Sequence, residues 1–290
     1  MFQAEPCLQA ALENYFKSIG RCTFGFKSAV YVPDPQGVLP DGVPARDFRA
    51  TVGISSRDVV CQFAITSRYF RHGQLNKVDY SGENFVNPPF SLGIAFGSDD
   101  SLRLLLSQES DERLLYRIFM NRDFLVPTLG ILPRCGGISL LDMLAQVTPT
   151  EIEQDKARNT IRAQTRHGRL EILLDPSQGY APKQVTLVKD PHSLLDDEKP
   201  LSSFDHWKSP VDSLTIEVHV TSYLPSPPAG VPGAFTVQSV WKLADGREIV
   251  QRSGCQVQDF VVLAPEAPLT IATPIPNGTP VTVKGAEQIQ

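Results

Sequence analysis

TIRAQTRHGRLEILLDPSQGYAPKQVTLVK, residues 160–189, is the stretch that decides the fold class. It predicts three consecutive antiparallel strands, which cover roughly Asn159 to Thr165, Arg169 to Leu174 and Lys183 to Lys189. In the second strand, apolar side chains alternate with others and fall on one face, namely Leu170, Ile172 and Leu174. Strict alternation is typical of a strand with one buried face, so the stretch favours a β-meander.

The two connections within this stretch carry turn residues at the positions where turns need them. His167-Gly168 joins the first two strands, and Asp175-Pro176-Ser177-Gln178-Gly179 joins the second and third. Asp suits the first turn position, Pro presets φ for the next one, and Gly accepts the positive φ that ends such a loop. Local turn chemistry and strand periodicity therefore agree.

The same alternation recurs before and after this stretch. The alternating series, apolar except for Ser239, are Cys22, Phe24 and Phe26; Phe48, Ala50, Val52 and Ile54; Val59, Cys61, Phe63 and Ile65; Leu214, Ile216, Val218 and Val220; and Phe235, Val237, Ser239, Trp241 and Leu243. The turn Ala244-Asp245-Gly246-Arg247 precedes a long strand from Ile249 to Val262. The chain is predicted to form many strands, each with one buried, apolar face (the dry face) and one solvent-exposed face (the wet face).

Three segments have helical periodicity. Residues 5–20 place Leu8, Leu12 and Phe16 at helical spacing, with Pro6 suited to a first turn and Gly20 to a C-terminal stop. A helical insertion is predicted at about 108–147, with one helix in its first half and a second, short one opening at Ser139. The helices are few and the strands many.

Composition excludes several classes of function. The chain has 290 residues with a net charge of −5, and its charges are scattered without a basic stripe, so nucleic acid is not an expected partner. No apolar run is long enough for a membrane span. The N-terminus does not have the pattern of a signal peptide, so we expect a cytoplasmic protein or one whose leader was removed or missed.

Cysteine and histidine give no catalytic or metal signature. The five cysteines lack any C-x-x-C pair and are interpreted as small buried hydrophobes, with a Cys7–Cys22 bridge left open for an oxidising compartment. The densest polar cluster consists of His192, Asp196, Asp197, Glu198, Asp205 and His206. It could be a metal site, but a solvated loop is the simpler interpretation; no cofactor is expected. The outward arginines Arg49, Arg158 and Arg162 are interpreted as part of the wet face.

Large side chains of the dry face leave a useful ambiguity, because they suit both a packed core and an apolar ligand pocket. If a cavity exists, the expected ligand-binding residues are Phe24, Phe26, Ile54, Phe63, Ile65, Ile216, Val218, Phe235 and Trp241. No catalytic residue and no metal ligand is predicted.

The segment HGRLEILLDPSQGYAPKQVTLV, at 167–188, resembles the strand–turn–strand core of the LolA/LolB-like lipoprotein-carrier superfamily. The beginning, ALENYFKSIGRCTFGFKS, resembles the helix and first strand of that family. The ending, VQDFVVLAPEAPLTIATPIPNGTPVTV, is similar to large secreted relatives in planctomycete-type bacteria. The chain departs from the carriers in its length and its long Pro-rich loops.

This resemblance implies a mainly β protein of a single domain, residues 1–290. Its curved antiparallel sheet would form an incomplete β-barrel, covered by the N-terminal helix and two inserted helices. It also implies a periplasmic or otherwise extracytoplasmic monomer that binds a lipid or the acyl chains of a lipoprotein without catalysis. One alternative is a sensor module that uses the same half-barrel to bind an envelope protein. Another is a hydrolase or other enzyme whose active site lies in the polar loops.

Overall fold

The fold is mainly β, as predicted. A computed structural model describes residues 7–31, 43–54, 59–71, 74–87, 90–96, 102–107, 134–135, 138–194, 200–204, 209–225, 228–264 and 281–284. The strands of the large sheet are β1 (Cys22–Tyr31), β2 (Arg46–Ile54), β3 (Val59–Arg71), β4 (Gln74–Asn87), β5 (Phe90–Phe96), β6 (Leu102–Ser107), β9 (Glu153–Asp155), β10 (Thr160–Thr165), β11 (Gly168–Asp175), β12 (Ala181–Lys189), β13 (Val211–Tyr223), β14 (Pro232–Leu243), β15 (Glu248–Val262) and β16 (Val281–Lys284). A separate ribbon pairs β7 (Arg134–Cys135) with β8 (Ile138–Ser139).

Hydrogen bonding links the strands in the order β16-β6-β5-β4-β3-β2-β1-β15-β14-β13-β12-β11-β10-β9. Neighbours are antiparallel in every described pairing except β16 with β6, which is parallel. No described residue pairs β16 with β9, so the described sheet is open, as expected of an incomplete barrel.

The chain divides into two compact units by its internal contacts. Unit 1 comprises residues 1–19 and 125–254, and unit 2 comprises residues 20–124 and 255–290. Strand β15 contributes its first part to unit 1 and its second part, from Cys255, to unit 2. The expectation of a single domain stays a prediction.

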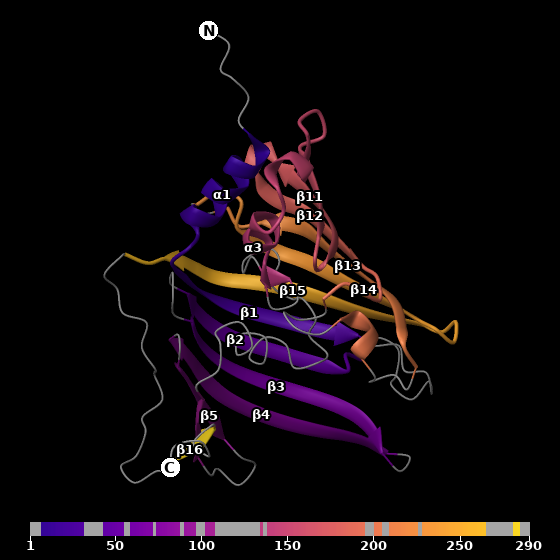
Figure 1. Cartoon of the computed structure of the whole chain (residues 1–290). Helices are drawn as coiled ribbons and strands as arrows, with labels where there is room; N and C mark the ends of the chain where they lie inside the picture. Colours follow the sequence, from indigo (N-terminus) through magenta and orange to yellow (C-terminus); the bar gives the residue numbers. More distant parts are fainter. Residues whose placement is uncertain are drawn as a thin grey trace, which may run out of the picture. The chain divides into compact units, whose positions relative to one another are not determined.

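Unit 1 contains the described helices, α1 (Leu8–Ser18) and α3 (Leu140–Ala145), and the short 3-10 turns η1 (Pro149–Glu151), η2 (Pro176–Gln178) and η3 (Leu201–Ser203). Helix α1 contacts β10 and β12, and α3 contacts β10 (Figure 1). The buried residues of α1 are Leu8, Ala11, Leu12, Tyr15 and Phe16, on the face that its periodicity predicted. It is shorter than predicted, because Cys7 is its N-cap and Ile19 its C-cap. The first predicted inserted helix lies outside the described residues, and no described helix is long and apolar enough to cross a membrane.

The central hairpins of unit 1 follow the sequence closely. Strands β10, β11 and β12 pair in antiparallel register, with Ile161 opposite Ile172 and Ile172 opposite Val185. The carboxylate of Asp175 accepts from the backbone N–H of Ser177 at 3.0 Å, and Gly179 has the positive φ of 67° that closes the loop. This Asp-Pro turn is therefore confirmed.

One charged side chain belongs to the buried face of this unit. Lys189 is fully buried, and its ammonium donates to the carbonyl oxygen of Leu194 at 2.5 Å. His167, expected in a loop, is in a turn as predicted but is buried. Its neighbour Gly168 explains the burial, because this turn packs directly on the backbone of Val188 and Lys189.

Gly168→Ala should lower the free energy of unfolding by about 3 kcal/mol or more, because φ is +122° there and a Cβ would collide with the carbonyl oxygen of Val188. Gly179→Ala is the matched control, since its φ is also positive but its Cβ would meet nothing within 4 Å. We expect the control to lose only about 1 kcal/mol. Urea unfolding of both variants measures the difference, and equal losses would contradict the packing described for the turn.

Candidate functional site

The predicted ligand-binding residues fall into both units. Ile216 and Val218 on β13 and Phe235 and Trp241 on β14 belong to unit 1, and their side chains are at most 1% exposed. Strand register brings them together, because Val220 pairs with Phe235 and Leu214 with Trp241. They form one continuous buried face with apolar residues of β11 and β12, which are Leu170, Ile172, Leu174, Val185 and Leu187.

In unit 2, the aromatic members of the predicted set lie on the buried face. Phe24 and Phe26 on β1 are buried, whereas Phe63 on β3 is half-buried. Ile54 ends β2 and Ile65 lies within β3, but their side chains are outside the described set. The structure thus brings at least three of these five side chains to one face.

Two further phenylalanines join this cluster and were missed as site residues. The ring of Phe48 lies 5.9 Å from that of Phe26 and 6.4 Å from that of Phe63, and Phe260 stacks on Phe24 at 6.2 Å. Edge-to-face and offset stacks of this kind stabilise aromatic cores. The alternation Phe48, Ala50, Val52 carried a signal for the first of them.

Trp241 differs from its apolar neighbours because it carries a hydrogen-bond donor. Its ring stacks on that of Phe204 at 4.9 Å between centroids. The indole Nε1 is buried and has no hydrogen-bond acceptor among the described residues. A buried donor without an acceptor is rare in folded proteins, so it marks a position where an acceptor is missing.

Histidines and acids do not form a metal site in the part of the chain that the structure describes. No group of three or more metal-binding side chains occurs there. His192 is exposed beside Asp190, whose side chain accepts from the N–H of Ser193 and of His192, and His219 is exposed on β13 as predicted. Asp196, Asp197, Glu198, Asp205 and His206 of the predicted cluster, and His72, lie outside the described residues.

A hollow of about 470 Å³ lies in unit 2, and most of its outward-pointing side chains are polar. Strand register places three rows of side chains there: Lys27, Arg49, Ala64 and Ser81; Gly25, Thr51 and Gln62; and, on β15, Gln258 and Asp259. These residues alternate with Phe24, Phe26 and Phe48, so their side chains lie on the opposite face of the strands. The described hollow is therefore not on the apolar face, where the sequence suggested a cavity.

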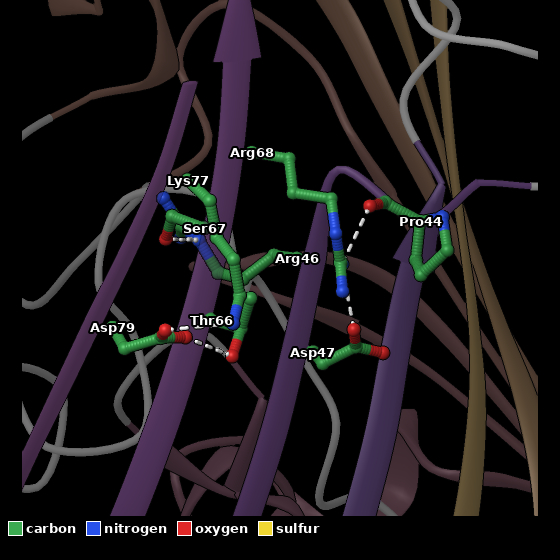
Figure 2. Close-up of polar contacts among 8 residues, drawn as sticks. All are labelled: Pro44, Arg46, Asp47, Thr66, Ser67, Arg68, Lys77 and Asp79. Carbon is green, nitrogen blue, oxygen red and sulfur yellow. Dashed lines mark hydrogen bonds and ion pairs between the residues drawn. The ribbon is translucent and has the colours of Figure 1, made fainter. Parts of the chain in front are cut away.

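Beside this hollow, the outward face carries ion pairs. Arg68 donates to the carboxylate of Asp47 at 2.6 Å and to the carbonyl of Pro44, while Asp79 accepts from Lys77 and from the hydroxyl of Thr66 (Figure 2). Hydrogen bonds from Lys77 and then Thr66 hold the pKa of Asp79 below its usual value. Both carboxylates are therefore already neutralised by partners of their own.

The described cysteines are free thiols in two environments. Cys22 and Cys255 are buried in unit 2, and desolvation raises the pKa of each to about 12. Cys7 is exposed at the N-terminus of α1, where a backbone hydrogen bond at Ala10 and then the side chain of Gln154 lower its pKa below the usual 9.0. Only Cys7 among these three has the properties of a reactive thiol.

Phe26→Asp should lower the free energy of unfolding by about 3 kcal/mol or more, because it buries an unpaired carboxylate in the aromatic cluster. Phe63→Asp is expected to lose clearly less, because Phe63 is only half-buried and water can reach a carboxylate at this position. Thermal and urea unfolding compare the two. Equal losses would place Phe63 in a closed core.

Cys7 should react with iodoacetamide at a lower pH than an ordinary thiol, because a lowered pKa increases the thiolate fraction at any pH below it. Cys22 and Cys255 should stay unlabelled up to about pH 9 in the folded protein, because burial excludes the reagent and keeps them protonated. Peptide mass mapping after timed labelling separates the cysteines, and labelling of Cys22 as fast as Cys7 would contradict this assignment.

Comparison with known proteins adds little to this geometry. No family model matches the chain, and no curated protein matches it in sequence. Among solved structures, it is similar to a candidate thioesterase II of Thermobifida fusca YX, at 10% identity and a TM-score of 0.14 over 82% of this chain and 79% of that one. It is also similar to MucB in complex with MucA(peri), at 8% identity and a TM-score of 0.11 over 89% of this chain and 99% of that one. At such scores, neither structure carries an argument about fold or function.

Proposed function

We propose that this protein binds a lipid or an acylated ligand, without catalysis, on the apolar face of its sheet, and that it acts in the bacterial cell envelope outside the cytoplasm. The observation that carries the proposal is the buried indole N–H of Trp241, which lies on this face and has no acceptor among the described residues.

The apolar face of unit 1 is large enough for a chain-like ligand. It runs without interruption over β11, β12, β13 and β14, each of which contributes at least two buried apolar side chains. Helix α1, which contacts β12, provides part of its cover (Figure 1). An acyl chain on this face would replace helix side chains with groups of the same chemical kind, so the exchange is close to neutral in transfer free energy.

The cover is held by a small number of polar contacts. The side-chain oxygen of Gln154 accepts from the backbone N–H of Leu8 at 2.9 Å, and the hydroxyl of Tyr15 donates to the carbonyl of Gly230 at 3.0 Å. Each such hydrogen bond contributes about 1 kcal/mol net. Helix α1 is thus an element that a bound ligand could displace at modest cost.

Trp241 adds a polar requirement to this apolar surface. A ligand carbonyl could accept from its Nε1, and leaving such a donor unpaired costs about 1–3 kcal/mol. An ester or amide carbonyl next to an acyl chain combines both features, since it offers an acceptor at the end of an apolar body. Fatty esters and N- or S-acylated peptides have this chemistry.

Native mass spectrometry of the purified protein, followed by organic extraction, should show a co-purified acyl species. A second measurement locates it: the chain has two tryptophans, so Trp207→Phe leaves only Trp241 as a fluorophore. A lipid with brominated acyl chains should quench this fluorescence saturably, because the bromine atoms would lie against the indole ring.

Trp241→Phe keeps an aromatic ring and removes the donor, so it should weaken acyl-ligand binding by a factor of about 2 to 10. Tyr15→Phe is the matched control, because it removes a buried donor that already has an acceptor in the protein. It should lower stability without weakening binding. Protein of bare mass that shows no quenching would contradict the proposal, and a stoichiometric protein partner without lipid would favour the interaction module instead.

A further inference from the structure

The outward face of unit 2 presents two cations directly opposite each other. Lys27 on β1 and Arg49 on β2 are cross-strand partners, and both side chains are exposed. Like charges in this arrangement destabilise an antiparallel pair. Fold stability alone therefore does not account for both residues at these positions.

Two other outward arginines in the described chain, Arg158 and Arg162, have acidic partners. Arg162 donates to Glu171 at 2.7 Å, and Arg158 lies 3.7 Å from Asp155. In contrast, neither Lys27 nor Arg49 has an ion pair with any described side chain. Two acids on the same face, Asp47 and Asp79, are already bound by Arg68 and Lys77 (Figure 2).

The two cations border the 470 Å³ hollow, which also offers neutral hydrogen-bond donors. Ala64 and Gly25 are small and therefore leave space in the hollow. Thr51, Gln62 and Ser81 contribute two hydroxyl groups and a side-chain amide. An arginine beside hydroxyl and amide donors suits a tetrahedral oxyanion, because the guanidinium can donate two parallel hydrogen bonds.

Among the described residues that line this hollow, Asp259 is the one acid. Its φ of 52° is unusual for a residue with a side chain. Gln258 and Asp259 are consecutive and both exposed, so the alternation of buried and exposed residues along β15 is interrupted here, as it is at a β-bulge. The carboxylate oxygen of Asp259 lies 3.9 Å from the position that a Cβ on Gly25 would occupy. It reduces the positive charge of the hollow without forming an ion pair with either cation in the described structure.

We propose that this hollow binds the phosphate group of a phosphomonoester, with Lys27 and Arg49 as its charged ligands and Thr51, Gln62 and Ser81 as neutral donors. A phosphomonoester is close to a dianion at neutral pH, so it matches two cations. The hollow is larger than a phosphate group, and the rest of the molecule occupies the remaining space. Within unit 2, this site lies on the face opposite to Phe24, Phe26 and Phe48, and it does not depend on the function proposed above.

Titration calorimetry of the full chain with phenyl phosphate, at low ionic strength, should give saturable binding to one site. Lys27→Gln and Arg49→Gln should each weaken it about tenfold or more, because each removes a charge-assisted hydrogen bond. Asp259→Asn should strengthen binding, because it removes a negative charge while asparagine tolerates positive φ. Amide chemical-shift changes should be confined to residues around Gly25, Thr51 and Gln62.

Control variants distinguish binding at this site from general electrostatic attraction, and a loss of affinity from a loss of folded protein. Lys183→Gln and Arg169→Gln remove exposed cations of unit 1 and should leave binding unchanged. Lys27→Gln should raise the melting temperature, because it relieves the like-charge pair, so a loss of affinity in this variant cannot reflect unfolding. Ala64→Gln should weaken binding by filling the hollow while both cations remain.

Vesicles of phosphatidylcholine with phosphatidic acid, whose head group is a phosphomonoester, distinguish the source of the phosphate. Binding to these vesicles and not to phenyl phosphate would assign a lipid head group, and the reverse would assign a soluble compound. Absence of saturable binding to both, or equal weakening by Lys183→Gln and Lys27→Gln, would overturn the proposal. The acyl-ligand experiment uses Trp241 as its readout, so the two proposals fail separately.

Discussion

Each unit of this chain depends on the burial of one face of its strands and the hydration of the other. In antiparallel strands the side-chain period is two, so a shift of one residue in any pairing would reverse both faces at once. The described pairings keep Ile161, Ile172, Val185 and Val218 in one cross-strand row, and Phe26, Ala50 and Phe63 in another. In unit 1, helix α1 then contacts β10 and β12.

Such a division gives the two faces different chemical tasks. The inward rows are mainly apolar, and the Trp241 Nε1 stands out among them because it is buried and has no acceptor among the described residues. On the outward rows, polar atoms are expected. The unusual feature there is the pair of like charges formed by Lys27 and Arg49, which the stability of the fold does not require. The two proposals therefore come from opposite anomalies, an unmatched donor in an apolar environment and unmatched cations in a polar one.

Sequence periodicity predicted the strands around Phe24, Ile172 and Trp241, because these elements alternate strictly and end at Gly, Pro or Asp. The segment that forms β4, Gln74–Asn87, has no such regular alternation. Asn, Asp and Gly lower the strand propensity of that segment, and pairing with β3 along its whole length overrides this preference. Helix ends were also displaced, because the backbone, and not the spacing of apolar residues, determines where the caps form.

The hollow could not be predicted from the sequence, because it depends on which residues become cross-strand neighbours. In the sequence, Arg49 resembles Arg158 and Arg162, and all three were interpreted as a wet face. Only the register places Arg49 opposite Lys27, while Arg162 meets Glu171. The burial of His167 could not be predicted either, because it depends on the close approach of Gly168 to the backbone of Val188 in β12, about 20 residues further along the chain.

The buried thiols of Cys22 and Cys255 can serve as probes of local unfolding in unit 2. Both are shielded in the closed state, and Cys255 lies within hydrogen-bonding distance of the Ser28 hydroxyl at 3.5 Å. Each becomes an ordinary thiol once its strand separates from its neighbours, so its rate of modification measures how often that happens. Because β1 and β15 carry one thiol each, the two rates would show whether these strands open together as one cooperative segment or fray independently.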